Sequence, residues 1–217
     1  MEFLVNIMLE VLKFFYAIGG HNWGLAICWL TIAVNLALYP LTLSSLQQMS
    51  AMQRIQPRLQ EIQKKYKEEP KKLQQEMMDL YKAEGVNPVG GCLPVLLKIP
   101  FFLALFFALQ SKEFIALVGP NAAFIPGWIN DIAKPDPIFI LAGLIGVTTW
   151  LSQKSMPATP GQGQAMIVFM PIFITFISYN FAAGVQIYWI ISNLMGWLQQ
   201  SYIMSQKIPK GKSGGKA

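Results

Sequence analysis

The residues able to do chemistry are uncharged polar side chains within long apolar stretches. Thr31, Asn35 and Thr42 lie at positions i, i+4 and i+11, and therefore on one face of a helix. Polar residues recur in three later stretches: Thr148, Thr149, Gln153, Thr175, Ser178, Tyr188, Trp189, Ser192, Asn193, Gln199 and Gln200. Such groups line hydrated cavities, or they bond across packed helices for roughly 0.6 kcal/mol each. The pattern is consistent with either interpretation.

Lys98 is the one formal charge inside an apolar stretch. A lysine within a membrane span usually faces a cavity or extends its ammonium group to the nearer interface. Both placements remain open from the sequence.

Enzymatic chemistry finds little support in the residue types. The apolar stretches hold no Asp or Glu, and the only histidine, His21, lies outside them. The two cysteines, Cys28 and Cys92, have neither metal-site nor disulfide-framework spacing. We therefore predict a protein that is not an enzyme and has no metal or cofactor. A channel or secondary transporter remains the alternative because polar stripes also line pores, although no acid is available for ion coupling. A membrane scaffold also stays open.

The elements that hold these residues are predicted from charge and hydropathy. The chain has 217 residues, of which 53% are hydrophobic and 13% charged, whereas soluble domains are about 25% charged. A span needs about 20 mostly apolar residues. We predict an all-α membrane protein with five spans, at 23–46, 92–110, 137–151, 164–179 and 185–204.

Residues 1–20 differ from these spans because charged residues interrupt their apolar pattern. Apolar residues recur there at helical spacing, with Glu2, Glu10 and Lys13 between them. The pattern predicts an amphipathic helix lying in the membrane interface. An uncleaved signal peptide is the alternative, but it would carry a basic rather than acidic start.

Residues 47–84 form the one strongly polar insertion. Met52, Ile55 and Leu59 begin a narrow apolar seam, and Pro70 follows a break. This predicts a helical hairpin in which Pro57 either kinks the first helix or marks its start. The hairpin is either a solvated connector or a docking arm, whose basic residues are Arg54, Arg58, Lys64, Lys65, Lys71 and Lys72.

Basic residues predict the orientation of the spans, because they concentrate on the cytoplasmic side. Thirteen of the 17 basic residues lie in the hairpin, the loop 152–163 and the tail 205–217. Only Lys13, Lys112 and Lys134 lie on the other side, which includes the loop 111–136. The N-terminus is therefore predicted outside and the C-terminus in the cytoplasm. The net charge of +6 is then mainly an orientation signal, and DNA is not predicted as a partner.

Several motifs resemble the YidC/Oxa/Alb family of membrane-protein insertases, and in particular the core of its bacterial members. They are Leu38-Tyr39-Pro40-Leu41-Thr42, the run from Gln75 through Asn87-Pro88-Val89-Gly90-Gly91-Cys92 to Pro94, Pro100-Phe101-Phe102, and Ser192-Asn193-Leu194. The resemblance covers about residues 23–205. It implies five spans around a hydrophilic groove that is open to the cytoplasm and the lipid, in the bacterial inner membrane.

The resemblance also implies a function. The groove would take in polar segments of nascent membrane proteins and release their helices into lipid, without nucleotide hydrolysis. Its residues here would be Thr31, Asn35, Lys98, Thr148, Thr175, Tyr188, Trp189, Ser192 and Asn193. The hairpin would dock the ribosome, signal-recognition components or the Sec translocon. The lysines of the tail either touch ribosomal RNA or belong to a disordered end.

One departure from the family pattern concerns the charge in the groove. The family usually has an arginine four residues after the span-one threonine, and here that position is Asn35, while Lys98 stands where a neutral residue is more common. Either the positive charge has moved from the first span to the second, or it is lost and Lys98 extends to the interface.

Overall fold

The computed structural model describes residues 2–87, 93–119, 122–155 and 164–205. Within these ranges the chain forms nine helices and no strand: α1 (Glu2–Ile18), α2 (Trp23–Ala37), α3 (Tyr39–Lys65), α4 (Pro70–Ala83), α5 (Leu93–Leu109), α6 (Lys112–Val118), α7 (Ile140–Ser155), α8 (Gln164–Ser178) and α9 (Ala183–Ser205). The predicted all-α class is confirmed.

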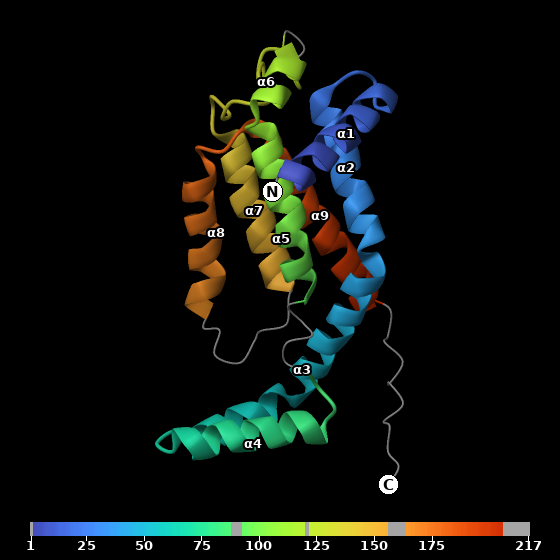
Figure 1. Cartoon of the computed structure of the whole chain (residues 1–217). Coiled ribbons are helices and arrows are strands. Elements are labelled where there is room, and N and C mark those ends of the chain that lie inside the picture. The colour runs from blue at the N-terminus through green and yellow to red at the C-terminus, as the bar shows by residue number, and fades with distance from the viewer. Residues whose placement is uncertain (1, 88–92, 120–121, 156–163, 206–217) are drawn as a thin grey trace.

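The helices form an elongated bundle from which α3 and α4 project at one end, while α6 caps the other (Figure 1). We refer to these as the hairpin end and the α6 end. The predicted tail beyond residue 205, most of the loop 152–163 and the motif at 88–92 lie outside the described residues.

Length and hydropathy do not single out individual spans. No single helix in the described part of the chain is both long and apolar enough to cross a membrane alone. Two bent pairs meet the requirement together: Phe3–Ile18 with Trp23–Ala37, bent by 112°, and Lys98–Leu109 with Lys112–Val118, bent by 63°. The number of five spans stays a prediction.

The main hydrophobic core lies at the α6 end. It buries Leu12 of α1, Ile27 of α2, Leu105 of α5, Phe114 of α6 and Val185 of α9. Ile27 lies near the start of α2, Leu105 near the end of α5 and Val185 near the start of α9. The core therefore joins these three helices at the same end of the bundle. Burial of apolar side chains, at about 25 cal/mol per Å² where water is displaced, fixes their arrangement.

Two glycines allow unusually close packing in this core. A Cβ atom at Gly24 would lie 2.0 Å from Cδ2 of Phe124, and one at Gly184 would lie 2.9 Å from Cδ1 of both Ile27 and Leu109. The loop after α6 therefore presses directly on the α2 backbone. The start of α9 is also tied to this loop, because Gly184 N–H donates to the Ile132 carbonyl at 2.9 Å.

The structure differs from the predicted boundaries in three places. Leu38 interrupts the range 23–46, since Pro40 starts a new helix and cannot donate a backbone hydrogen bond. That helix, α3, continues through Pro57 to Lys65, so Pro57 does not mark its start. The range 111–136, predicted as a loop, contains α6, whose seven residues are too few to show a period.

Helix α1 has apolar side chains on more than one face. Met8, Leu9 and Leu12 are buried against the bundle, whereas Phe3 and Phe14 are exposed. The helix packs against α2 and α5 at the α6 end. Its placement in a membrane interface stays a prediction.

Candidate functional site

A hydrogen bond between Lys98 and Asn35 joins α5 to α2. The Lys98 Nζ atom donates to Asn35 Oδ1 at 2.8 Å. Asn35 is 1% exposed, and its Nδ2 atom donates to the Thr31 carbonyl at 2.8 Å. The second bond fixes the orientation of the amide, so its oxygen faces the ammonium group. The residue that stands at the family's arginine position thus contacts the lysine on the neighbouring helix.

Helix α9 completes this polar contact through Gln199. Its Nε2 atom donates to the backbone carbonyl of Asn35 at 3.2 Å. The other side-chain atom, Oε1, is buried without a hydrogen-bond partner within the described residues. Gln199 was outside the predicted site, although its shared face with Tyr188 and Ser192 was a signal for it. Buried unpaired acceptors are costly and commonly hold water.

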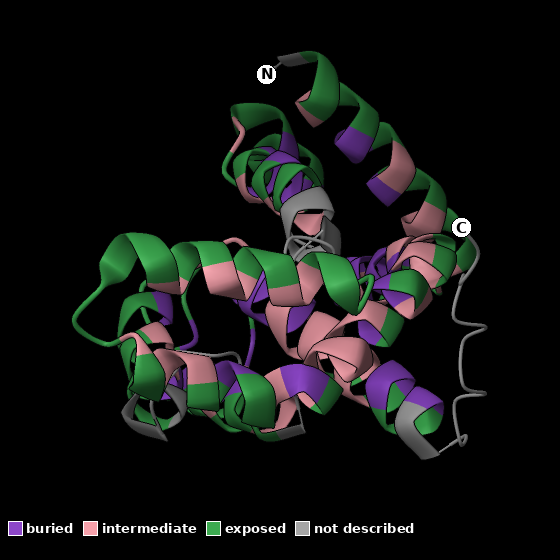
Figure 2. Ribbon diagram, turned by 90° about the horizontal axis from the view of Figure 1, so that it is seen from below, coloured by how far each residue is buried: buried purple, intermediate pink, exposed green. Residues whose placement is uncertain are grey.

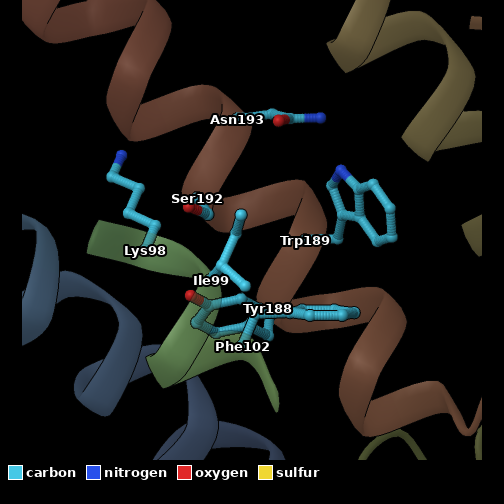
Figure 3. A pocket seen from close by; sticks show the side chains of 7 residues that line it. All are labelled: Lys98, Ile99, Phe102, Tyr188, Trp189, Ser192 and Asn193. Carbon is cyan, nitrogen blue, oxygen red and sulfur yellow. The ribbon is translucent and has the colours of Figure 1, made fainter. Parts of the chain in front are cut away.

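A cavity of about 260 Å³ lies beside Lys98, between α5 and α9 (Figure 3). Five residues of the predicted site line it together with Ile99 and Phe102: Lys98, Tyr188, Trp189, Ser192 and Asn193. The Phe102 ring meets Trp189 edge-on at a centroid distance of 5.4 Å. The cavity therefore presents one ammonium group, an amide and a hydroxyl next to aromatic faces.

Asn193 also ties α9 to α7. Its Nδ2 atom donates to Oγ1 of Thr149 at 2.9 Å and to Oγ1 of Thr148 at 3.3 Å. Thr148 in turn donates to the Leu144 carbonyl at 2.8 Å within α7. Thr148 thus reaches the cavity through Asn193 and is not among the residues that line it.

Two predicted site residues bond mainly within their own helices. Thr31 is fully buried and donates to the Ile27 carbonyl at 2.6 Å, so it supports Asn35 from one turn away. Thr175 donates to the Pro171 carbonyl at 2.8 Å. It packs where α8 meets α7, since a Cβ atom at Gly146 would lie 2.2 Å from Thr175 Oγ1. The structure does not bring Thr175 together with Lys98.

The six basic residues predicted for docking are all exposed on the hairpin: Arg54, Arg58, Lys64, Lys65, Lys71 and Lys72. Viewed from the hairpin end, exposed residues run along α4, while buried ones gather inside the bundle (Figure 2). A small core of Ile55, Leu59 and Val86 holds the two arms together.

Three of these basic side chains contact other residues of the hairpin. Arg58 pairs with Glu84 at 2.5 Å, and the Nζ atoms of Lys65 and Lys72 lie 5.1 and 5.0 Å from the centre of the Tyr66 ring. The structure gives Arg54, Lys64 and Lys71 no ion pair within the described residues.

The hairpin also contains a partly buried phenol. Burial raises the pKa of Tyr81 above its ordinary value of 10.0.

Asp136 was missed by the sequence reasoning. It is 1% exposed and accepts hydrogen bonds from Trp128 Nε1 at 2.8 Å, Ile138 N at 3.2 Å and Leu141 N at 2.8 Å. It therefore caps the start of α7, which lies at the α6 end of the bundle (Figure 1), whereas Lys98 belongs to the first half of α5. An isolated acid in a polar loop gave no signal of this burial.

The cavity offers hydrogen-bond donors and acceptors beside aromatic side chains. No group of three or more His, Cys, Asp or Glu residues able to hold a metal occurs in the described ranges. Fold and site together define an α-helical bundle protein with a projecting helical hairpin and a largely apolar cavity that contains the polar groups of Lys98, Ser192 and Asn193.

Comparison with known proteins places this bundle in one family. The family model described as "60Kd inner membrane protein" matches residues 14–210. The chain belongs to this family, and the resemblance predicted from its motifs is confirmed. The family places it among the inner membrane proteins.

Two relatives and one solved structure illustrate the match. The chain is 39% identical to the "Membrane protein insertase YidC" of Legionella pneumophila (strain Corby), over 93% of this chain and 35% of the relative. It is 41% identical to the protein of the same name from Cellvibrio japonicus (strain Ueda107), over 95% of this chain and 36% of the relative. The chain thus spans about a third of the length of these relatives.

The solved structure is titled "Active YidC insertase crystal structure with the first transmembrane domain resolved". It matches with a TM-score of 0.70 at 23% identity, covering 91% of this chain and 46% of that chain. This likeness supports the fold of the helical bundle.

Proposed function

We propose that the chain is a membrane-protein insertase and chaperone. In this proposal it takes polar segments of nascent membrane proteins into a hydrated groove and releases their apolar helices into lipid. The names of its relatives support this function. The observation that carries it is the cavity between α5 and α9, where Lys98, Ser192 and Asn193 lie next to aromatic side chains and Lys98 is also bonded to Asn35 of α2.

The physical role of such a site is to lower a transfer cost. Polar backbone groups are expensive in hydrocarbon unless they keep hydrogen-bond partners. Lys98, Ser192 and Asn193 offer donors and acceptors to a polar segment during its passage. Transfer of the substrate's own apolar side chains into lipid, at about 0.8 kcal/mol per buried CH₂, then drives release. No covalent intermediate or nucleotide is part of the proposal.

We further propose that Lys98 supplies the positive charge of the groove from α5, in place of an arginine at position 35. The 2.8 Å bond to Asn35 supports this, because it draws the ammonium group toward α2. Lys98 lies about one and a half turns into α5, where an isolated charge is costly unless it is solvated or paired.

The proposed setting is the bacterial plasma membrane, with five spans, the N-terminus outside and the C-terminus in the cytoplasm. The distribution of basic residues supports this orientation. The hairpin is then a cytoplasmic arm for the ribosome, signal-recognition components or the Sec translocon. Arg54, Lys64 and Lys71 are the residues most available for such contacts, since Arg58, Lys65 and Lys72 already have partners within the hairpin.

Photocrosslinking during translation tests the insertase function. A crosslinkable residue at Ser192 or Trp189 should capture a nascent membrane protein, whereas one at Lys112, which is exposed at the α6 end, should not. Equal capture from both places, or from neither, contradicts the proposal.

An insertion assay tests the position of the charge. Lys98→Ala and Lys98→Gln should both lose insertion, and adding Asn35→Arg to Lys98→Gln should restore it. A Lys98→Ala protein that inserts substrates as well as the unchanged chain would refute the relocated charge while leaving the insertase function standing. Lys112→Ala serves as the control, because that lysine is exposed and far from the cavity.

A further inference from the structure

A second, open groove lies between α7 and α8. Of the residues that the sequence assigned to the insertase groove it contains only Thr175, which the structure does not bring together with Lys98. Its volume is about 330 Å³, within the range of about 300–1,000 Å³ of small-ligand sites. Its walls are almost entirely apolar, from Gly143, Gly146, Val147 and Trp150 on α7 and from α8 residues including Val168 and Ile172. No Cβ atom fills the space above Gly143, which has no other atom within 4 Å of where one would stand.

The face of α7 that lines the groove continues to a lysine, Lys154, near the end of the helix. Gly143, Val147, Trp150 and Lys154 follow one another at spacings of four, three and four, so they form a stripe on one helix face. The Lys154 Nζ atom lies 4.7 Å from the centre of the Trp150 ring, a cation–π distance. Lys154 thus lies one turn beyond Trp150, the last α7 residue that lines the groove, at the end of α7 that points toward the hairpin (Figure 1).

The dimensions of this stripe match one leaflet of a bilayer. Eleven residues separate Gly143 from Lys154, which corresponds to about 16 Å of helix at about 1.5 Å per residue. Half of a bilayer's hydrocarbon thickness is about 15 Å. An acyl chain lying along the stripe would therefore bring its headgroup level with Lys154. Tryptophan and lysine are also the side chains typical of that level.

We propose that this groove binds one phospholipid of the hairpin-side leaflet, with an acyl chain between α7 and α8 and an anionic headgroup phosphate against Lys154. Val168 and Ile172, on the α8 side of the groove, are 56% and 64% exposed, so the groove is open to the surroundings of the bundle. The site requires the chain to lie in a membrane but is independent of insertase activity. The lipid would fill the α7–α8 groove, so α8 would be held by lipid as well as by α7.

Native mass spectrometry of the full chain, purified in detergent and incubated with phosphatidylglycerol or phosphatidylcholine, tests this site. The unchanged chain should retain one phosphatidylglycerol. Gly143→Leu should lower retention at least tenfold, since its side chain fills the groove. Gly196→Leu is the matched control, because Gly196 is another helical glycine with open space around its Cβ position, and it should retain the lipid.

The headgroup is tested separately. Lys154→Gln should reduce the preference for phosphatidylglycerol over phosphatidylcholine about fivefold, the effect of one lysine at an anionic surface. Lys64→Gln, an exposed hairpin lysine, should leave that preference unchanged. Equal retention by the unchanged chain and Gly143→Leu, loss in Gly196→Leu as well, or a retained second copy of the chain in place of lipid would each overturn the proposal. None of these readings depends on insertion, so they stay separate from the crosslinking test.

Discussion

The two ends of the bundle are held together by different means. At the α6 end, apolar side chains of six helices interlock, and Gly24 and Gly184 let neighbouring elements approach within van der Waals contact. At the hairpin end, Asn35, Asn193 and Gln199 join helices through one or two side-chain hydrogen bonds each, beside an open cavity. Close packing, together with the buried Asp136 at the start of α7, fixes the α6 end, whereas exchangeable polar contacts fix the hairpin end.

This difference does not come from unpaired polar atoms, because both ends have them. Trp23 Nε1 and Gln186 Oε1 lie near the α6 end, and Gln199 Oε1 lies near the hairpin end, each buried without a partner in the described residues. What differs is the surrounding space. Interlocked side chains resist rearrangement, whereas a bond between two amides can be replaced by a bond to water or to a substrate segment. We infer that binding takes place at the hairpin end while the α6 end stays closed.

The largest effect is expected for the buried acid at the α6 end. Asp136→Ala removes an acceptor from three donors, and a hydrogen bond to a charged group is worth about 1.5–3 kcal/mol. We expect the free energy of unfolding to fall by at least about 3 kcal/mol, measured by titration with denaturing detergent in mixed micelles. Asp131→Ala is the control, because Asp131 is partly exposed and pairs with exposed Lys134. Equal losses in the two variants would mean that Asp136 does not organise this end.

The polar contact at the hairpin end should show as a coupling energy. In a double-mutant cycle of Asn35→Leu and Lys98→Met, we expect a coupling of about 1.5–3 kcal/mol in the free energy of unfolding. The physical reason is the 2.8 Å bond between the amide oxygen and an ammonium group in a poorly solvated place. Pairing Asn35→Leu with Lys112→Met instead should give no coupling. A coupling energy of zero between Asn35 and Lys98 would contradict the proposal that Asn35 on α2 positions the ammonium group of Lys98.

Close packing at the α6 end gives the next prediction. Gly24→Val places side-chain atoms where the Phe124 ring lies, and overpacking of a well-filled site costs about 1–3 kcal/mol. The thermal midpoint of the purified protein should fall accordingly. Gly196→Val makes the same change in a helix with open space at the Cβ position, and it should have a much smaller effect. If both variants lose the same stability, helix propensity rather than shape is responsible.

Patterns in the sequence indicated where most helices lie, but they indicated only some of the contacts between helices. Charge-free runs and Pro70 located most helices because composition and proline act locally. Thr175 was expected with Lys98 on polarity alone, yet it packs on Gly146, and nothing in one sequence says which faces of two helices meet. Asp136 and α6 were missed for a related reason: an isolated acid and a seven-residue helix carry no period. Asn35 and Lys98, which are 63 positions apart in sequence, were linked through the family pattern.

The smallest effect is expected from the contact between α7 and α9. Asn193 Nδ2 donates to both Thr148 and Thr149, so either threonine can keep the bond when the other is lost. Thr148→Val and Thr149→Val should each change the free energy of unfolding by less than about 0.6 kcal/mol, the mean for a hydrogen bond between membrane helices. The double variant should exceed the sum of the two, because only then does the amide lose both acceptors. Measured in the same mixed micelles, strict additivity would show that the two bonds act independently and that the hairpin end is less adaptable than we infer.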